Sequence, residues 1–385
     1  MKKIFLFLIL LLPINVFALD YPKLNSKYVM VYDLTDDNVL YEIDSDKETA
    51  IASLTKIATT ITAIESIENL NDEVEITRNI LSTVDPVAST AGLKAGDKLT
   101  YLDLLYASML PSGADATNSL AILTSGSIEN FVSKMNGLAS RIGLNNTHFV
   151  NVTGLDEEGH YSTIKDIKNL LTYSLKNETF KKIFTTKEYT LSNGLTVYTT
   201  LKKYNKNLNL DLSKIIGSKT GFTYDAGYCL ATLSNIDDHE IVIINLNAPY
   251  QTGVSYHLID NVTLINFIDK NYSDEVISTK DSFVKTIPVK FSNIKSYDIK
   301  TSSDVNYYLA KDYNKDLVEI KYEGKEKLNF LDKKGSKIGK IIYYYDSKII
   351  NEEDVYLNQN ISINKMIPII GVIVLIGLVI IIRRK

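Results

Sequence analysis

The sequence predicts an α+β fold in which helices lie between an early strand pair and a later group of strands. The early pair spans residues 28–43, where two β-rich runs flank a polar turn at residues 35–38. From Leu54 to Ile64, apolar residues recur at the spacing of one face of an amphipathic helix. Strand-like runs return only from residue 188 onward. Helices and strands therefore occupy separate regions of the chain, which is typical of the α+β class.

Further helices are expected between these two strand regions. A Thr-x-x-Asp pattern that begins at Thr100 is a typical helix start, and Pro111 lies where that helix is expected to end. Two more helices are expected over residues 115–123 and 128–142, and Gly143 stops the second. Apolar residues in this helical region recur at helical spacing, so one face of each helix can pack against a core.

The later strands begin with a hairpin expected in residues 188–199, because an Asn-Gly dipeptide separates two strand-like runs there. A strand pair follows in residues 214–219 and 227–232, and a further apolar run covers residues 241–246. These runs predict the main sheet of the first domain.

Chain length and a change of composition predict two domains. The chain has 385 residues, and its composition changes near residues 271–280. Residues 19–272 are expected to form the first domain, and residues 276–357, which alternate in strand fashion, a small all-β domain. We expect the second domain to act as a spacer between the first domain and the membrane.

Both ends of the chain carry segments that predict targeting. Residues 1–18 start with a cationic stretch, continue with an apolar run and end in a small residue, which predicts a cleaved signal peptide. Residues 363–382 are apolar almost throughout and long enough to predict a transmembrane anchor. The positive residues 383–385 are expected to form a cytoplasmic tail. The sequence thus predicts a single-pass cell-membrane protein whose body lies outside the cytoplasm.

Charge and composition exclude several classes of partner. The formal net charge is −4 with both signs intermixed, so no basic face predicts nucleic-acid binding. Cys229 is the single cysteine and cannot form an internal disulfide, so we expect it to be a small core residue. His148 and His160 lack a third ligand at usual spacing, so neither a metal nor a cofactor is expected.

Ser53 and Lys56 are the first candidate catalytic residues. They are three residues apart at the start of the expected helix, so a hydroxyl and an amine project from the same turn. Serine becomes an effective nucleophile when a base takes its proton, and a lysine can be that base when burial or a nearby positive charge lowers its pKa. The S-x-x-K pattern alone is weak, because it also occurs at solvated helix starts.

Two further motifs strengthen this interpretation. Ser112 begins a Ser-Gly-Ala sequence in a loop that ends a helix, and Lys219-Thr220-Gly221 lies at the end of a predicted strand. A serine-lysine pair, a second serine and a second lysine in this order resemble the motifs of the D-alanyl-D-alanine carboxypeptidases, which are low-molecular-mass serine penicillin-binding proteins. The resemblance covers residues 25–270 well and the β-domain more loosely. Other matching stretches are residues 91–97, 146–149, 153–155, 160–163 and 221–227.

This resemblance implies both a fold and a reaction. The fold would be a transpeptidase domain like that of penicillin-binding proteins and serine β-lactamases, followed by a small all-β domain and a transmembrane helix. Ser53 would attack the penultimate D-alanine of a peptidoglycan stem pentapeptide, with Lys56 as general base and Ser112 as proton relay. Hydrolysis of the acyl-enzyme would complete removal of the terminal D-alanine, and β-lactams would be covalent inhibitors.

The resemblance also implies a substrate-binding set around the second lysine. Lys219 would be a fixed cation and Thr220 a hydroxyl donor for the free terminal carboxylate. Gly221 would let the substrate backbone approach the strand closely. Phe222 would share with Ser53 the backbone N–H groups that stabilise the oxyanion.

One position departs from the family pattern. The second motif is usually Ser-x-Asn, whereas the third residue here is Ala114. Either a neighbour such as Asn118 supplies the missing amide, or turnover and specificity differ. Asp115 is interpreted as a structural residue at a helix start. Two alternatives stay open. One is a catalytically weak protein that binds wall peptides, which Ala114 suggests, and the other is a serine β-lactamase, which shares the S-x-x-K and K-T-G motifs.

Overall fold

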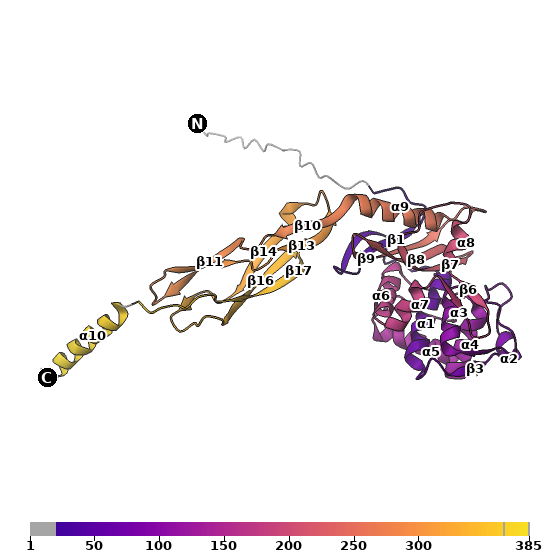
Figure 1. Ribbon diagram of the computed structural model, residues 1–385, viewed down its shortest axis with the longest axis horizontal. Coiled ribbons are helices and arrows are strands. Elements are labelled where there is room, and N and C mark those ends of the chain that lie inside the picture. Colours follow the sequence, from indigo (N-terminus) through magenta and orange to yellow (C-terminus); the bar gives the residue numbers. More distant parts are fainter. Residues whose placement is uncertain (1–20, 365, 384–385) are drawn as a thin grey trace, which may run out of the picture. The chain divides into compact units, whose positions relative to one another are not determined.

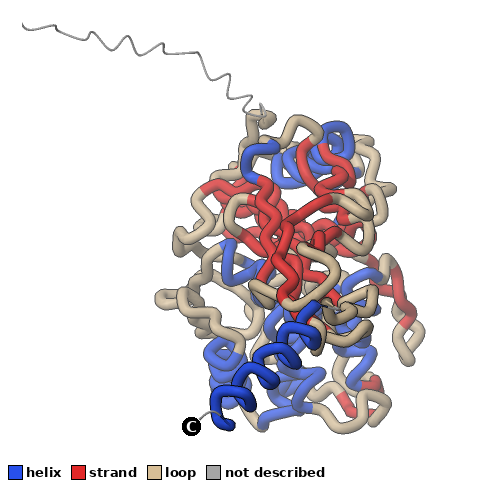
Figure 2. Tube along the Cα trace, turned by 90° about the vertical axis from the view of Figure 1, so that its left-hand side faces the viewer, coloured by secondary structure: helices blue, strands red, loops and turns tan. Residues whose placement is uncertain are grey.

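The computed structural model describes residues 21–364 and 366–383. The expected signal peptide, residues 1–18, lies outside the described residues. The chain divides into two compact units, one comprising residues 20–271 and the other including residues 272–385. Helices and strands both contribute to the described chain (Figure 2), which confirms the mixed α+β class.

The first unit is organised around a five-stranded antiparallel sheet with the order β2-β1-β9-β8-β7. Its strands are β1 Tyr28–Asp33, β2 Asn38–Ile43, β7 Ile215–Thr223, β8 Gly227–Ile236 and β9 His239–Ala248. Helix α9, Tyr256–Asn271, lies on one side of the sheet and the larger group of helices on the other (Figure 1). Strands β8 and β9 are almost continuously buried because both faces are covered.

Strand β7 lies at an edge of this sheet, next to β8. An edge strand presents backbone N–H and C=O groups that its sheet leaves unpaired. The outer side of β7 can therefore receive an extended peptide as an additional strand.

Helix α1 lies at the centre of the helical group. It follows a short 3-10 turn and contacts α3, α4, α5, α6 and α7. The sequence predicted an amphipathic helix with one apolar face, but every residue from Thr55 to Ala63 is buried. Helices on several sides enclose α1, and its threonines and Lys56 are enclosed with it. The helices are η1 Ala52–Leu54, α1 Thr55–Ser66, α2 Arg78–Leu81, α3 Tyr101–Met109, α4 Ala114–Ser125, α5 Ile128–Arg141, α6 Ile164–Leu175, α7 Glu178–Thr185 and α8 Leu201–Asn205.

Local sequence signals account for the starts and turns of several elements. Helix α3 begins with the predicted capping box, in which Thr100 and Asp103 exchange side-chain and backbone hydrogen bonds. The Asn-Gly dipeptide lies between β5 and β6 as predicted, and Gly194 has φ 85°. The small strand pairs are β3 Glu73–Glu75 with β4 Lys98–Thr100, and β5 Glu188–Thr190 with β6 Thr196–Tyr198.

The second unit is β-rich, as the sequence predicted. Its sheets have the orders β10-β13, β12-β11-β15 and β14-β16-β17. Ile299, Ile341 and Tyr343 belong to its own buried apolar cluster. Its elements are β10 Tyr272–Ser278, β11 Phe283–Lys290, β12 Ser296–Lys300, β13 Val305–Ala310, η2 Lys315–Leu317, β14 Val318–Gly324, β15 Leu328–Asn329, β16 Lys337–Tyr345 and β17 Lys348–Tyr356.

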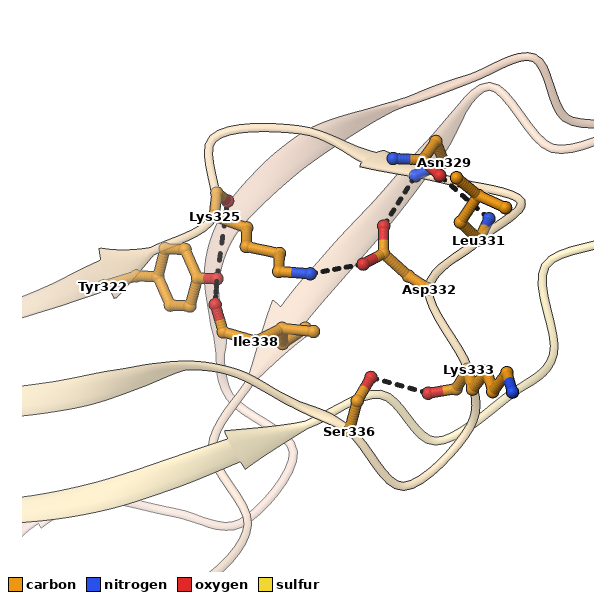
Figure 3. Close-up of polar contacts among 8 residues, drawn as sticks. All are labelled: Tyr322, Lys325, Asn329, Leu331, Asp332, Lys333, Ser336 and Ile338. Atoms are coloured by element: carbon orange, nitrogen blue, oxygen red, sulfur yellow. Dashed lines mark hydrogen bonds and ion pairs between the residues drawn. The ribbon is translucent and has the colours of Figure 1, made fainter.

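Polar contacts order the connection between β14 and β16 in this unit (Figure 3). Asp332 accepts a hydrogen bond of 2.8 Å from the backbone N–H of Asn329 and forms an ion pair with Lys325. The Tyr322 hydroxyl donates to the carbonyl of Ile338 at 2.8 Å. These contacts hold the loop in place beside β15 and need no bound ligand.

The C-terminal segment forms helix α10, Met366–Arg383, which overlaps the region expected to cross the membrane, residues 363–382, and extends one residue beyond it. Residue 365 and the side chains of residues 366–371 and 381 lie outside what the structure describes. Within the described residues, no helix has the length and apolarity that a membrane span requires.

Candidate active site

Ser53 lies on the 3-10 turn that leads into α1. The preceding residue, Ala52, has φ 46°, in the left-handed region that non-glycine residues rarely adopt. Its carbonyl packs against Gly154, where an added Cβ would lie 1.9 Å from the Ala52 oxygen. A strained turn and a close backbone approach therefore set the position of the Ser53 hydroxyl, as is common at functional sites.

Lys56 contacts the Ser53 hydroxyl, as the S-x-x-K spacing predicted. Lys56 Nζ lies 3.1 Å from Ser53 Oγ and donates to the carbonyl of Thr153 at 2.6 Å. Its side chain is almost fully buried, and this burial lowers the pKa of Lys56 to about 7, although the charge of Asp115 acts in the opposite direction. A substantial fraction of the amine is therefore unprotonated at neutral pH and can accept the serine proton.

Ser112 and Lys219 form a second pair at the same site. Ser112 lies between α3 and α4 with φ 64°, another left-handed non-glycine residue. Lys219 Nζ, on β7, donates to Ser112 Oγ at 2.9 Å and to the carbonyl of Thr220 at 2.8 Å. Among the described residues, the hydrogen bond of Ser112 is thus to Lys219 and not to Lys56, the partner that the sequence analysis expected.

Lys219 differs from the fixed cation that the resemblance implied. It is buried, and burial together with the neighbouring charge of Lys56 lowers the pKa of Lys219 well below its usual value. A bound carboxylate favours the charged form of a lysine, because an opposite charge raises the lysine pKa. The charge on Lys219 is therefore coupled to an anionic ligand.

Strand β7 brings Thr220, Gly221 and Phe222 to the wall of a pocket of about 1050 Å³ that also includes Ser53 and Ser112. A Cβ on Gly221 would lie 2.9 Å from the backbone nitrogen of Ser53, so glycine permits this close approach of β7. The two serine hydroxyls thus face a pocket whose wall is the edge strand.

The residues around Ala114 support the structural interpretation of Asp115. Its carboxylate accepts backbone hydrogen bonds from Ala91, Gly92 and Leu93 at 2.8, 2.9 and 3.0 Å. These contacts fasten the loop before β4 to the start of α4.

Asn118 does not replace the amide that Ala114 lacks. Its Nδ2 donates to the carbonyl and to the hydroxyl of Thr83, each at 3.1 Å, away from the pocket lining. Of the two explanations for Ala114, compensation by Asn118 is therefore wrong.

A hydrogen-bond chain behind Ser53 was missed by sequence reasoning. His160 Nδ1 accepts from the backbone N–H of Val150 at 3.1 Å, so the ring proton lies on Nε2, which is 2.8 Å from Thr55 Oγ1. Thr55 in turn donates to the carbonyl of Ala52 at 2.9 Å. Burial lowers the pKa of His160 to about 4, which keeps the ring neutral and the chain intact at neutral pH. The only sequence signal for this chain was the family-like stretch at residues 160–163.

One group in the described chain brings potential metal ligands together. Asp33, Asp36 and His239 place ligand atoms within 4.8 Å of one another. His239 Nδ1 is 2.8 Å from Asp33 Oδ2, while Asp33 Oδ1 accepts from the backbone N–H groups of Thr35 and Asp36. This arrangement is explained by the turn between β1 and β2, and the group contributes nothing to the pocket lining.

Comparison with known proteins gives the family. The family model described as D-alanyl-D-alanine carboxypeptidase matches residues 15–250. The chain belongs to this family of low-molecular-mass serine penicillin-binding proteins. A second family model, described as the C-terminal domain of penicillin-binding protein 5, matches residues 272–362.

Individual known proteins are similar over most of the chain. The D-alanyl-D-alanine carboxypeptidase DacF of Bacillus subtilis is 27% identical, with 87% of this chain and 86% of that protein covered. The structure of the Streptomyces K15 DD-transpeptidase has 28% identity and a TM-score of 0.58, covering 65% of this chain and 98% of the other. Penicillin-binding protein 5 of Haemophilus influenzae, at 22% identity and a TM-score of 0.65, shares the fold over 90% of this chain and 100% of the other.

Proposed function

We propose that this protein is a serine-type D-Ala-D-Ala carboxypeptidase that removes the terminal D-alanine of peptidoglycan stem pentapeptides. The observation that carries the proposal is the contact of 3.1 Å between Ser53 Oγ and the Lys56 amine, whose pKa is about 7. Membership of the D-alanyl-D-alanine carboxypeptidase family supports the same reaction and does not favour a β-lactamase or a binding protein.

The first chemical step is formation of an acyl-enzyme. Lys56 takes the proton of Ser53 as the hydroxyl oxygen attacks the carbonyl of the penultimate D-alanine. Gly221 permits a close approach of β7 to Ser53. We therefore assign the backbone N–H groups of Ser53 and Phe222 as the donors that stabilise the developing oxyanion. Such donors contribute about 3–4 kcal/mol to the transition state.

The second chemical step is departure of the terminal D-alanine and hydrolysis of the ester. Ser112 accepts a hydrogen bond from Lys219, which leaves its own hydroxyl proton free to be donated to the leaving nitrogen. Among the described residues Lys56 contacts Ser53 and Thr153 and not Ser112, so we assign the return of its proton through Ser112 to the substrate complex. There the proton that Lys56 took from Ser53 replaces the one that Ser112 gave up, and Lys56 is neutral again when water attacks the acyl group.

The terminal carboxylate of the peptide is assigned to Lys219 and Thr220. An anion there raises the pKa of Lys219 and so restores the charge that burial suppresses. The unpaired edge of β7 would hold the extended peptide by backbone hydrogen bonds. β-Lactams, which also carry a carboxylate near a reactive carbonyl, would acylate Ser53 in the same orientation.

The decisive experiment is D-alanine release from a stem pentapeptide by the chain comprising residues 19–360. Wild-type protein should release D-alanine and form a covalent adduct with fluorescent penicillin, and Ser53→Ala should lose both. Persistent labelling of Ser53→Ala would assign the nucleophile elsewhere. Labelling without D-alanine release would support a penicillin-binding protein that only holds wall peptides.

We further propose that the catalytic unit works outside the cytoplasm and is anchored by its C-terminal segment. The support is the apolar sequence of residues 367–382 followed by three positive residues, together with the predicted signal peptide at residues 1–18. A peptidoglycan substrate requires the same location.

A further inference from the structure

The pocket in front of Ser53 extends well beyond the candidate catalytic residues. It has a volume of about 1050 Å³, and its lining continues past Thr220 and Thr200 to helix α8. A neighbouring hollow of about 670 Å³, whose lining also includes Lys187 and Glu188, shares Lys202 and Lys206 with it. A leaving D-alanine, with a single methyl side chain, occupies only a small part of this space.

Three lysines line the extension: Lys202, Lys203 and Lys206. All three are exposed, and none forms an ion pair with another described residue. Among the described residues that line the pocket, none is an Asp or a Glu. This concentration of positive charge contrasts with the formal net charge of −4 for the whole chain and suits an anionic ligand.

Helix stability accounts for part of this charge, because Lys202 and Lys203 lie in the last turn of α8, where cations interact favourably with the helix dipole. The buried contact of the helix with the fold is made by Leu201. The three lysine side chains therefore remain exposed to what enters the pocket.

The position of Thr200 gives the direction of the groove. Its hydroxyl lies 2.5 Å from that of Thr220, and it immediately precedes the first residue of α8. In the proposed reaction Thr220 holds the terminal carboxylate of the substrate. The groove beyond Thr200 therefore lies on the side of the leaving residue and not on the side of the acyl group.

We propose that Lys202, Lys203 and Lys206 form a subsite for a second carboxylate carried by the leaving residue. This inference rests on the proposed function, because the role of Thr220 gives the groove its direction. The enzyme then prefers peptides whose last residue is acidic over peptides whose last residue is neutral and of the same size.

The test compares three acetylated peptides that end in D-Ala-D-Glu, D-Ala-D-Gln and D-Ala-D-Ala. Two readouts are measured, kcat/KM for release of the last residue and the inhibition constant in competition with fluorescent penicillin. The D-Glu peptide should be preferred over its neutral D-Gln isostere by about 3- to 10-fold, since each exposed ion pair contributes about 1.4- to 5-fold. The preference should shrink as salt is raised, because exposed charges are screened.

The triple variant Lys202→Gln/Lys203→Gln/Lys206→Gln should reduce the D-Glu to D-Gln ratio to about one, with little change for the D-Ala peptide. The matched control Lys94→Gln/Lys134→Gln/Lys176→Gln removes the same charge at exposed positions outside the pocket and should keep the wild-type ratio.

Several results would overturn the subsite. One is a D-Glu to D-Gln ratio of one in the wild-type protein. Another is an equal fall of this ratio in both triple variants. A third is an equal preference for an acidic residue on the acyl half of the peptide. If no peptide is hydrolysed, the carboxypeptidase proposal fails by itself, and the competition readout still decides whether the lysines select an acidic leaving residue.

Discussion

At the scale of single residues, burial determines the chemistry of the two candidate lysines. An exposed lysine is protonated at neutral pH and cannot act as a base. Lys56 and Lys219 are both withdrawn behind the pocket wall formed by Ser53 and Ser112, and for both the first cause of the lowered pKa is burial. The two serine hydroxyls line the pocket, and each contacts one of the buried lysines.

The pH dependence of acylation should report Lys56. Because the free amine is the active form, the rate of acylation by fluorescent penicillin should rise with pH through a midpoint of about 7 and then level off. The lowered pKa of Lys56 also affects the free energy of unfolding. Between about pH 7 and the unfolded pKa of roughly 10.4, the unfolded state binds more protons than the folded state, so the contribution of Lys56 to stability grows as pH rises. Rates and melting temperatures measured in parallel from pH 5 to 9 separate the two effects. A rate independent of pH across this range would exclude Lys56 as the base.

The chain from His160 through Thr55 to Ala52 should position the nucleophile. Thr55→Val keeps the shape but removes both hydrogen bonds, which leaves a buried His160 N–H unpaired at a cost of about 1–3 kcal/mol. Penicillin acylation by the folded fraction should fall by about 10-fold, and Thr55→Ser, which keeps the hydroxyl, should restore most of it.

The matched control for Thr55 is Thr60→Val on the same helix. Thr60 is also fully buried, but its hydroxyl has no hydrogen-bond partner in the described structure, so this change should leave acylation unaltered and should not lower the melting temperature. If Thr55→Val acylates at the wild-type rate, the chain is only structural.

At the scale of elements, the site depends on how closely an edge strand approaches a helix start. Strand β7 and the turn η1 come from distant parts of the chain, yet Gly221 has no room for a side chain beside the Ser53 nitrogen. The helical group holds α1 from several sides, while β8 holds β7 from one side and leaves its other edge facing the pocket. A rigid nucleophile thus faces a strand that can pair with substrate.

Gly221→Ala should separate these two elements. Its Cβ would lie 2.9 Å from the Ser53 nitrogen and 3.0 Å from the Ala52 Cβ, so β7 or η1 must shift, at a cost of about 1–3 kcal/mol. We expect penicillin acylation to fall by about 10- to 100-fold, since the oxyanion donors lose their alignment.

The control for Gly221 lies on the same strand. At Gly217 a Cβ would meet the Phe184 ring at 2.6 Å, so Gly217→Ala should lower the melting temperature while leaving the approach of β7 to Ser53 unchanged. Equal losses of acylation in the two variants, corrected for the folded fraction, would show that general destabilisation and not alignment is responsible.

At the scale of the whole molecule, the candidate catalytic residues all belong to the unit formed by residues 20–271. The β-rich unit has its own buried apolar cluster and its own ordered loop at Asp332. No candidate catalytic residue lies among the described residues of this second unit, and its expected role as a spacer stays a prediction.

Deletion of residues 361–385 should give a protein with unchanged acylation and D-alanine release. The catalytic groups lie before residue 225, and the deleted segment is expected only to anchor them. In intact cells that carry the full chain, protease added outside should degrade the catalytic unit, as the positive C-terminal residues predict. Protection of this unit, when other surface proteins are cut, would reverse the proposed topology.

The sequence by itself determined the features that depend on local spacing. The three-residue separation placed Ser53 beside Lys56, the Thr100 capping box started α3, and the Asn-Gly dipeptide formed its hairpin. Such features follow from backbone geometry over a few residues, so they can be predicted without knowledge of the tertiary packing.

Only the tertiary structure decided the contacts between residues that are distant in sequence. Ser112 and Lys219 are 107 positions apart, and Thr55 and His160 are 105 apart, so no periodicity could pair them. The burial that lowers the pKa of Lys56 likewise depends on helices packed on several sides of α1, which a sequence pattern showing one apolar face did not reveal. Each of these pairings depends on which helices and strands pack together in the folded chain. The spacing of residues along the sequence does not determine that packing.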